Sequence, residues 1–196
     1  MKRPAVLLAL LIVVVLSGCS EKDSSTISIK PYTLSEEEQN LISKTGVDAI
    51  LFFKLDGKLA EEEDLQFAME IYKDGVLTED QVYIKGQVEK EFNDDLISFG
   101  FNRQENELYF LSGMVNGLLE NLHDVEGIDS SSFTSFINDE KKLVKDEAVY
   151  LGSWIGSKGN ELEGLSINED GSLSDDVKTA DAAFVFKVML ADYENE

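Results

Sequence analysis

Apolar side chains recur at every second position along much of this chain, and this period of two constrains its fold more than any other feature. Over residues 65–72 and 97–101, large apolar side chains alternate with smaller or more polar ones, and residues 82–89 do so with one interruption. Such alternation is typical of β-strands with one buried face. Residues 184–190 are largely apolar at both sets of alternate positions, which predicts a central strand buried on both faces.

Further strands are expected at five segments: 47–55, 107–112, 141–145, 148–155 and 161–167. The dipeptides Asp56-Gly57, Asp74-Gly75 and Asp170-Gly171 favour turns, because both residue types tolerate positive φ. Strands separated by such turns favour a mainly β domain. The sequence therefore predicts a two-layer antiparallel β-sandwich of about eight or nine strands with one or two short helices.

Two short segments have helical features. Ser35, followed three residues later by Glu38, forms the pattern of a capping box, which predicts a helix that begins after Ser35. A second helix is expected from Ser131 to Asn138, where large apolar side chains recur at spacings of three and four. Both segments are expected to pack on the sandwich and not to form sites.

The composition excludes several classes of function. The chain has 196 residues, 17 Lys plus Arg against 39 Asp plus Glu, and a formal net charge of −22. Such a charge repels the phosphate backbone, so nucleic acid is not an expected partner. One cysteine and one histidine rule out an intramolecular disulfide and every motif that needs two histidines. The length suits a single domain with its own core.

The N-terminal segment carries the features of an export signal. A short basic start precedes an unbroken apolar run over residues 5–16. The run is shorter than the roughly 20 residues of a transmembrane helix but suits the h-region of a signal peptide. The order Leu16-Ser17-Gly18-Cys19 resembles the lipobox of bacterial lipoproteins. This resemblance implies cleavage between Gly18 and Cys19, with diacylglycerol and palmitate attached at Cys19.

The lipobox divides the chain into three parts. We expect a lipoprotein signal peptide over residues 1–18, a flexible tether over residues 19–26 and a single β-sandwich-like domain over residues 27–196. The tether is short and polar and has no apolar period. Two acyl chains hold a protein at a membrane durably, whereas one chain gives only marginal binding. The expected location is the extracytoplasmic face of the cell membrane, which the protein contacts through the lipid on Cys19.

Tyr150 and Trp154 are the residues expected to form a binding surface. In a regular strand they share one side with Gly152, and the glycine leaves room for a sugar ring or a partner loop to approach them. Aromatic rings with a polar edge suit such contacts. The alternative is that Trp154 packs in the core or at a sheet edge.

Carboxylates offer a possible calcium site. Segment 168–176 contains the candidate ligands Asn168, Asp170 and Asp175. The EF-hand register fails here, because Ser166 and Val177 stand where Asp and Glu are needed. These residues are therefore weak candidates, and the sequence predicts no metal site and no cofactor.

No catalytic residue is predicted either. A pair of acids could hydrolyse envelope glycans, but with 39 acids many pairs arise by chance. His123 lies in a polar stretch with no clear period and is expected in a solvated loop.

Three further segments carry a resemblance to a family. Residues 44–53, 64–67 and 150–156, together with the lipobox, look similar to uncharacterised lipoproteins of Bacillus-type Gram-positive bacteria. The resemblance covers most of the mature chain and implies no activity, cofactor or catalytic residue. We expect a non-catalytic module that binds a protein or polymer of the cell envelope. The alternatives are a carboxylate-dependent envelope hydrolase and a calcium-binding module.

Overall fold

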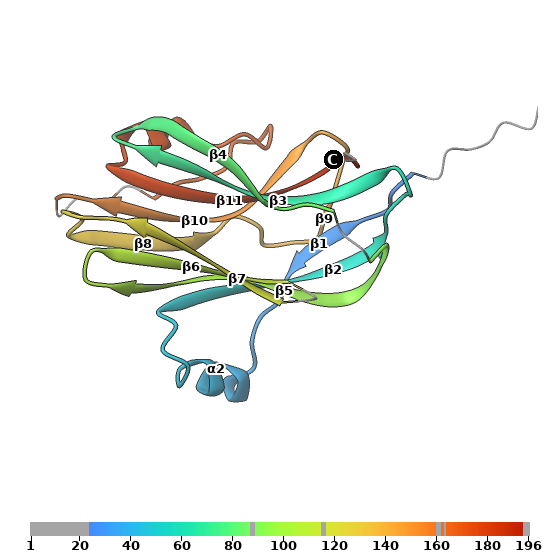
Figure 1. The fold of residues 1–196 in the computed structure, drawn as a ribbon, viewed down its shortest axis with the longest axis horizontal. Coiled ribbons are helices and arrows are strands. Elements are labelled where there is room, and N and C mark those ends of the chain that lie inside the picture. The colour runs from blue at the N-terminus through green and yellow to red at the C-terminus, as the bar shows by residue number, and fades with distance from the viewer. Residues whose placement is uncertain (1–23, 87–88, 115–116, 160–161, 163, 194–196) are drawn as a thin grey trace, which may run out of the picture.

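The computed structural model describes residues 24–86, 89–114, 117–159, 162 and 164–193. The strands form two antiparallel sheets that lie one above the other (Figure 1). This arrangement confirms the predicted mainly β, two-layer antiparallel architecture. None of the helices in these ranges is long and apolar enough to cross a membrane. Residues 1–18, which are expected to form a signal peptide, and Cys19 lie outside the described residues.

Sheet A contains six strands in the order β7-β6-β5-β2-β1-β9. They are β1 (Ser28–Pro31), β2 (Ala49–Lys58), β5 (Glu91–Gln104), β6 (Glu107–Met114), β7 (Gly117–Asp124) and β9 (Lys141–Lys142). Sheet B contains five strands in the order β4-β3-β11-β10-β8. They are β3 (Glu63–Lys73), β4 (Val76–Ile84), β8 (Ser130–Ser135), β10 (Ala148–Ser157) and β11 (Ala182–Asp192).

The predicted alternation builds the core between the sheets. The β3 side chains at every second position from Leu65 to Ile71 are buried and join one cluster with the inward residues of sheet A. Phe99 of β5 stacks on Phe186 of β11 with ring centroids 4.2 Å apart. Strand β11 lies between β3 and β10 and is buried on both faces, as its sequence predicts. The sheets therefore meet mainly through large apolar and aromatic side chains.

The outer face of sheet B is covered by the chain that leads into β11. Val177 of the 3-10 helix η1 (Asp175–Thr179) and Leu165 pack on Ile155 and Val185 in a second apolar cluster. The hairpin turn between β3 and β4 lies against the same segment, because Gly75 N–H donates to the carbonyl of Ala180 over 3.0 Å. Sheet B is thus covered on both faces.

Helix α2 (Glu36–Ile42) projects from sheet A between β1 and β2 (Figure 1). Its predicted capping box is confirmed: Glu38 N–H donates to Ser35 Oγ over 3.3 Å, and Ser35 N–H donates to Glu38 Oε2 over 2.7 Å. None of its residues is buried. The helix is therefore stabilised locally and does not pack into the core, contrary to the expected packing role.

Two expected segments differ from the structure. The helix expected over 131–138 is wrong, because residues 130–135 form β8, which pairs with β10 through six residue pairs. Serine is a weak helix former, and pairing along a whole strand overrides the helical spacing. The strand expected over 161–167 is also absent from the described part of that segment, where only Ile167 forms an isolated bridge.

The three Asp-Gly dipeptides have two different roles. Asp74 and Gly75 both have positive φ and form the β3–β4 turn, and Gly171 has positive φ in the turn that follows Asp170. Asp56-Gly57, in contrast, lies within β2 at a register shift against β5. A dipeptide that tolerates positive φ serves a bulge as well as a turn.

Candidate functional site: an apolar sheet face and a groove at its open edge

The outer face of sheet A is largely apolar. Phe53 and Phe99 point into the core, so their strand neighbours point outward. We call the outward side chains the apolar face: Ile50, Phe52, Leu96, Tyr109, Leu111, Leu118 and Leu122. The centre of this face contains the small residues Ser98, Gly100 and Gly113 in the same register, so little side-chain volume projects from the sheet there.

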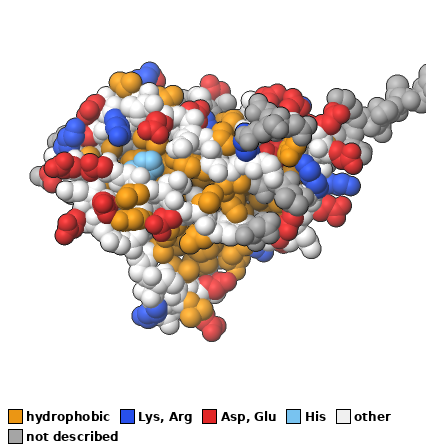
Figure 2. Space-filling view, in the orientation of Figure 1, with side chains coloured by type: hydrophobic (Ala, Val, Ile, Leu, Met, Phe, Trp, Pro, Cys, Tyr) orange, Lys and Arg blue, Asp and Glu red, His pale blue; other side chains and the backbone are white. Residues whose placement is uncertain are grey.

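Within the described ranges, no segment covers this face in the way that residues 164–180 cover sheet B. Leu118, Leu122 and Leu96 are 64%, 53% and 45% exposed. In the space-filling view, hydrophobic side chains gather along the lower side of the sandwich, next to helix α2 (Figure 2). Exposed apolar patches of this kind mark interaction surfaces more often than isolated exposed residues do.

Acidic side chains accompany the apolar face at its β6–β7 end. Tyr109 O–H donates to Glu107 Oε2 over 2.6 Å. This hydrogen bond, burial and the negative charges of Glu107 and Glu120 raise the pKa of the Tyr109 hydroxyl. The guanidinium of Arg103, on neighbouring β5, donates instead to the carbonyls of Glu105 and Ile128. Glu107 and Glu120 place negative charge on the face beside Tyr109.

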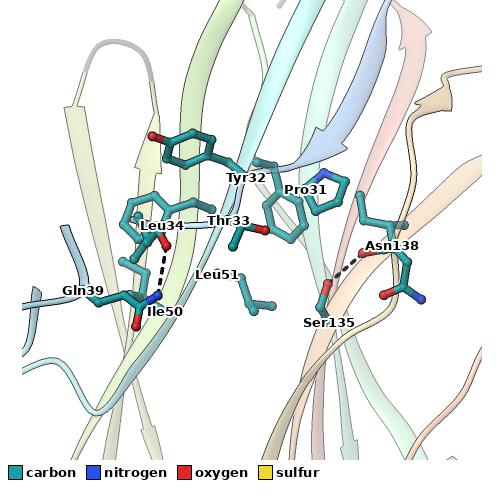
Figure 3. Close-up of a pocket in the computed structure, with 12 residues that line it drawn as sticks. Pro31, Tyr32, Thr33, Leu34, Gln39, Ile50, Leu51, Ser135 and Asn138 are labelled. Carbon is teal, nitrogen blue, oxygen red and sulfur yellow. Dashed lines mark hydrogen bonds between the residues drawn. The ribbon is translucent and has the colours of Figure 1, made fainter. Parts of the chain in front are cut away.

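A groove of about 390 Å³ lies where the apolar face meets the edge of sheet A (Figure 3). Its wall residues come from the end of β1, the link to α2, α2 itself, the first half of β2, and the end of β8 with the residues that follow it. We call it the β2 groove; it is lined by Pro31, Tyr32, Thr33, Leu34, Gln39, Ile50, Leu51, Phe52, Phe53, Ser135, Ile137 and Asn138.

The groove exists because β1 is much shorter than β2. Residues 28–31 of β1 pair with residues 53–56 of β2, whereas residues 49–52 have a strand partner only in β5. Tyr32 N–H still donates to the carbonyl of Phe52 over 2.8 Å, and then the chain turns away toward α2. The first half of β2 is thus an open sheet edge among the described residues.

Hydrogen bonds hold the groove walls in place. Tyr32 O–H donates to Glu38 Oε1 over 2.8 Å, and Lys54 Nζ lies 5.1 Å from the centre of the Tyr32 ring. Gln39 Nε2 donates to the carbonyl of Leu34 over 2.9 Å, and Ser135 Oγ donates to the carbonyl of Ile137 over 3.2 Å (Figure 3). Helix α2 is therefore tied to the end of β1 through its own capping residue.

Tyr150 and Trp154 do not share a surface, so the prediction for Trp154 is wrong. The pairing of β10 with β11 shifts by one residue between Tyr150 and Gly152. This bulge reverses the side on which the following residues point. Trp154 is fully buried and contacts the Phe184 ring edge-on at a centroid distance of 5.6 Å.

Tyr150 instead faces outward from sheet B and joins a buried ionic cluster. Lys187 Nζ lies 2.6 Å from Glu70 Oε1 and 2.9 Å from Asp80 Oδ2. The hydroxyls of Tyr72 and Tyr150 donate to the two oxygens of Glu70 over 2.7 and 3.0 Å. Burial acts to lower the pKa of Lys187, but the hydrogen bonds to Glu70 and Asp80 outweigh it and raise the pKa. This cluster joins four strands of sheet B.

A second hollow, of about 770 Å³, brings together three residues that the sequence analysis singled out. Tyr150, Asn168 and Asp170 all line it. Asp170 Oδ1 accepts hydrogen bonds from the N–H and hydroxyl of Ser172, which lower the pKa of the Asp170 carboxyl. Asn168 Nδ2 donates to Ser172 Oγ over 2.9 Å. These contacts form the turn after Ile167.

The calcium candidates do not assemble into a cage. Asp175 does not line the hollow of Asn168 and Asp170, and its Oδ1 lies 2.5 Å from Lys178 Nζ. Within the described ranges, no three His, Cys, Asp or Glu side chains form a group that could hold a metal ion. The carboxylates at this end are engaged in turns and ion pairs.

His123 lies in β7 and not in a solvated loop. Its ring packs on Phe110 and Phe184 at centroid distances of 5.8 and 4.9 Å. Burial lowers the pKa of the imidazole. Nε2 is buried and has no hydrogen-bond partner among the described residues. The residue therefore serves the packing of the β7 edge.

Neither the apolar face nor the β2 groove was predicted from the sequence. A signal for the face is present in residues 49–53, where five apolar side chains follow one another in a sheet with antiparallel turns. A strand with one solvated face alternates, so an unbroken apolar run indicates a second apolar face. Pro31 gives a signal for the groove, because proline cannot donate to a ladder and marks a strand end or edge.

The fold and these surfaces define an antiparallel β-sandwich domain with one covered and one uncovered outer face. The chain belongs to the YgaN domain family, whose family model matches residues 28–190. The match runs from the first residue of β1 into the last strand, β11. Comparison with curated proteins and with solved structures gives no match.

Proposed function

We propose that this protein is a lipid-anchored module on the extracytoplasmic face of the cell membrane, where it binds another protein without catalysing a reaction. The observation that carries the proposal is the uncovered apolar face of sheet A, with Leu118 and Leu122 more than half exposed. Burying such side chains contributes about 25 cal/mol per Å² of apolar surface removed from water. A partner that covers this face therefore gains substantial free energy.

The location rests on the N-terminal sequence. The lipobox at residues 16–19 supports lipid attachment at Cys19, the single cysteine of the chain. The net charge of −22 gives the domain no electrostatic attraction to anionic lipid. Two acyl chains would supply the attachment that the protein surface does not.

The charges around the apolar face support a partner with basic side chains. Glu107 and Glu120 lie beside Tyr109 on this face. At the opposite end, Lys30 and Lys54 lie 2.7 and 3.7 Å from Asp94, so these two cations already have a partner. A protein surface that combines apolar residues with Lys or Arg would complement both features.

Thiol labelling in intact cells tests this proposal. If a partner occupies the apolar face, Leu118→Cys and Leu122→Cys should react about tenfold more slowly with a membrane-impermeant maleimide in cells than after purification, as expected at about nine-tenths occupancy. The lipid on Cys19 leaves the introduced thiol as the only reactive one. Labelling is quantified by the mass shift of the purified chain.

Thr179→Cys is the matched control, because Thr179 is exposed on the segment that covers sheet B. Its thiol should react at the same rate in cells and after purification. Equal rates at positions 118 and 122 in the two states would contradict the binding role. Failure of the control thiol to react in intact cells would contradict the extracytoplasmic location.

A further inference from the structure

We propose that the β2 groove receives an extended segment of the partner protein, which adds to the open edge of β2 as a new strand of sheet A. The inference rests on the proposed function, because it specifies how the partner binds. It adds a mode of recognition and a ligand chemistry: a cationic polypeptide in the β conformation with alternating apolar side chains.

The backbone of Ile50 carries the first step. Tyr32 N–H donates to the carbonyl of Phe52, so the backbone groups of Phe52 point toward the β1 side. Backbone groups of alternate residues in a strand point the same way, which directs the N–H and C=O of Ile50 to that side as well. No described strand pairs with β2 at Ile50 on that side. An added strand would satisfy this donor and acceptor.

The side chains of the groove supply specificity. Leu51 and Phe53 line it from the core side of β2, and Ile50 and Phe52 line it from the outer side. An added strand also presents side chains alternately to the two sides. One set would meet Leu51 and the buried Ile137, while the other would continue the apolar face at Phe52. The groove is therefore continuous with the surface assigned to the partner.

Charge determines the chemistry of the segment's ends. Glu36 and Glu37 are exposed in the first turn of α2, beside the wall residue Gln39. On the opposite wall, the exposed Asp139 follows Asn138 directly. Acidic groups thus lie beside both walls. A segment flanked by lysine or arginine is favoured, whereas a second copy of this acidic chain is opposed by like charge.

Binding of a designed peptide to the purified lipoprotein in mild detergent tests this inference. The probe is a fluorescent peptide in which valine alternates with threonine and lysines occupy both ends. Fluorescence anisotropy should show saturable binding, and replacing the lysines by glutamate should weaken it about tenfold. Absence of binding by the lysine peptide overturns the strand-addition proposal.

Backbone methylation of the probe separates strand addition from simple apolar docking. N-methylation removes one N–H donor at a time without changing the side chain. Among the described residues of this edge, Ile50 offers the open donor and acceptor. A methyl group on the probe residue that pairs with Ile50 should therefore weaken binding about tenfold, whereas methyl groups on its two neighbours, whose N–H groups point away from β2, should have little effect. A methylation profile in which no position is more sensitive than its two neighbours overturns strand addition.

Two substitutions at one position give the matched test on the protein. Ile50→Pro removes the N–H that points into the groove and places a ring there, whereas Ile50→Ala removes the side chain but keeps the N–H. Proline is tolerated in an edge strand where its missing N–H faces the open side. We expect Ile50→Pro to weaken peptide binding about tenfold more than Ile50→Ala does. Equal binding by the two variants overturns the proposal.

Folding of the variants is followed independently through Trp154. It is the single tryptophan and is fully buried, so its emission shifts on unfolding. If Ile50→Pro unfolds the domain, the methylation profile with the unaltered protein decides the question. Thiol labelling at Leu118 tests the proposed function separately. It reports whether a partner covers the apolar face, and it does not depend on strand addition.

Discussion

Replacing Lys187 by alanine should lower the free energy of unfolding by about 3 to 5 kcal/mol, because it leaves Glu70 buried without its cation. Lys187 is 4% exposed and Glu70 is 6% exposed, so water cannot take the place of the missing partner freely. Urea titration followed by Trp154 emission measures the change. A loss below about 1 kcal/mol, the value typical of an exposed ion pair, would contradict the buried character of the cluster.

The double variant Glu70→Gln with Lys187→Met is the matched control. It removes both charges, and the glutamine amide can accept a hydrogen bond from one tyrosine hydroxyl through its oxygen and donate one to the other through its N–H. Replacing a buried ion pair by neutral groups of similar volume is often nearly neutral for stability. We therefore expect the double variant to be more stable than Lys187→Ala. If the double variant is less stable than Lys187→Ala, the two charges contribute more to stability than offsetting the cost of each other's burial.

The pKa shift of Lys187 determines the pH at which these measurements are informative. Its pKa is raised in the folded state. A group whose pKa is raised on folding contributes stability that is complete below its unfolded pKa, about 10.4 for lysine. The contribution is lost as the pH rises through the folded value. The comparison at neutral pH therefore measures the full effect.

Replacing Cys19 by alanine should abolish fatty-acid attachment and move the protein out of the membrane fraction. Each buried methylene of an acyl chain contributes about 0.8 kcal/mol, and the net charge of −22 gives no electrostatic attraction to an anionic membrane. Metabolic labelling with an alkyne fatty acid, followed by ultracentrifugation of lysed cells, measures both effects.

Ser20→Ala is the control for this substitution, because it changes the neighbouring residue and leaves the thiol in place. It should retain both the label and the membrane location. Continued recovery of the Cys19→Ala protein in the membrane pellet would show that the apolar run over residues 5–16 serves as the anchor.

Much of the sandwich could be predicted because its central strands have unambiguous patterns. The alternation over 65–72 and the two apolar sets over 184–190 correspond to β3 and β11, which build the core of sheet B. The capping box of Ser35 is equally local, since it depends on two residues three apart. Local patterns of this kind need no knowledge of distant partners.

Elements that depend on distant partners could not be predicted. Residues 130–135 have no strong alternation and become β8 only because β10 lies beside them. The bulge at Leu151 separates Tyr150 from Trp154, and no sequence period reports a shift of one residue. The β2 groove likewise requires β1 to end at Pro31 and residues 135–138 to approach from the other sheet.

The ionic cluster of sheet B is indicated in the sequence by single charged residues within apolar stretches. Lys187 is the single charged residue within the apolar stretch 182–191, and Glu70 interrupts a similar stretch in β3. A charge in a strand buried on both faces requires an opposite charge nearby. Such a lysine and such a glutamate, taken together, predict a buried pair and with it the adjacency of the two strands.

Intact-mass measurement of the protein purified from its own membranes tests the proposed lipid anchor most directly. The expected product begins at Cys19, lacks residues 1–18 and carries the mass of a diacylglycerol on its cysteine. A chain that begins at Met1, or one that begins near Cys19 with a free thiol, would contradict the anchor and the surface location that depends on it.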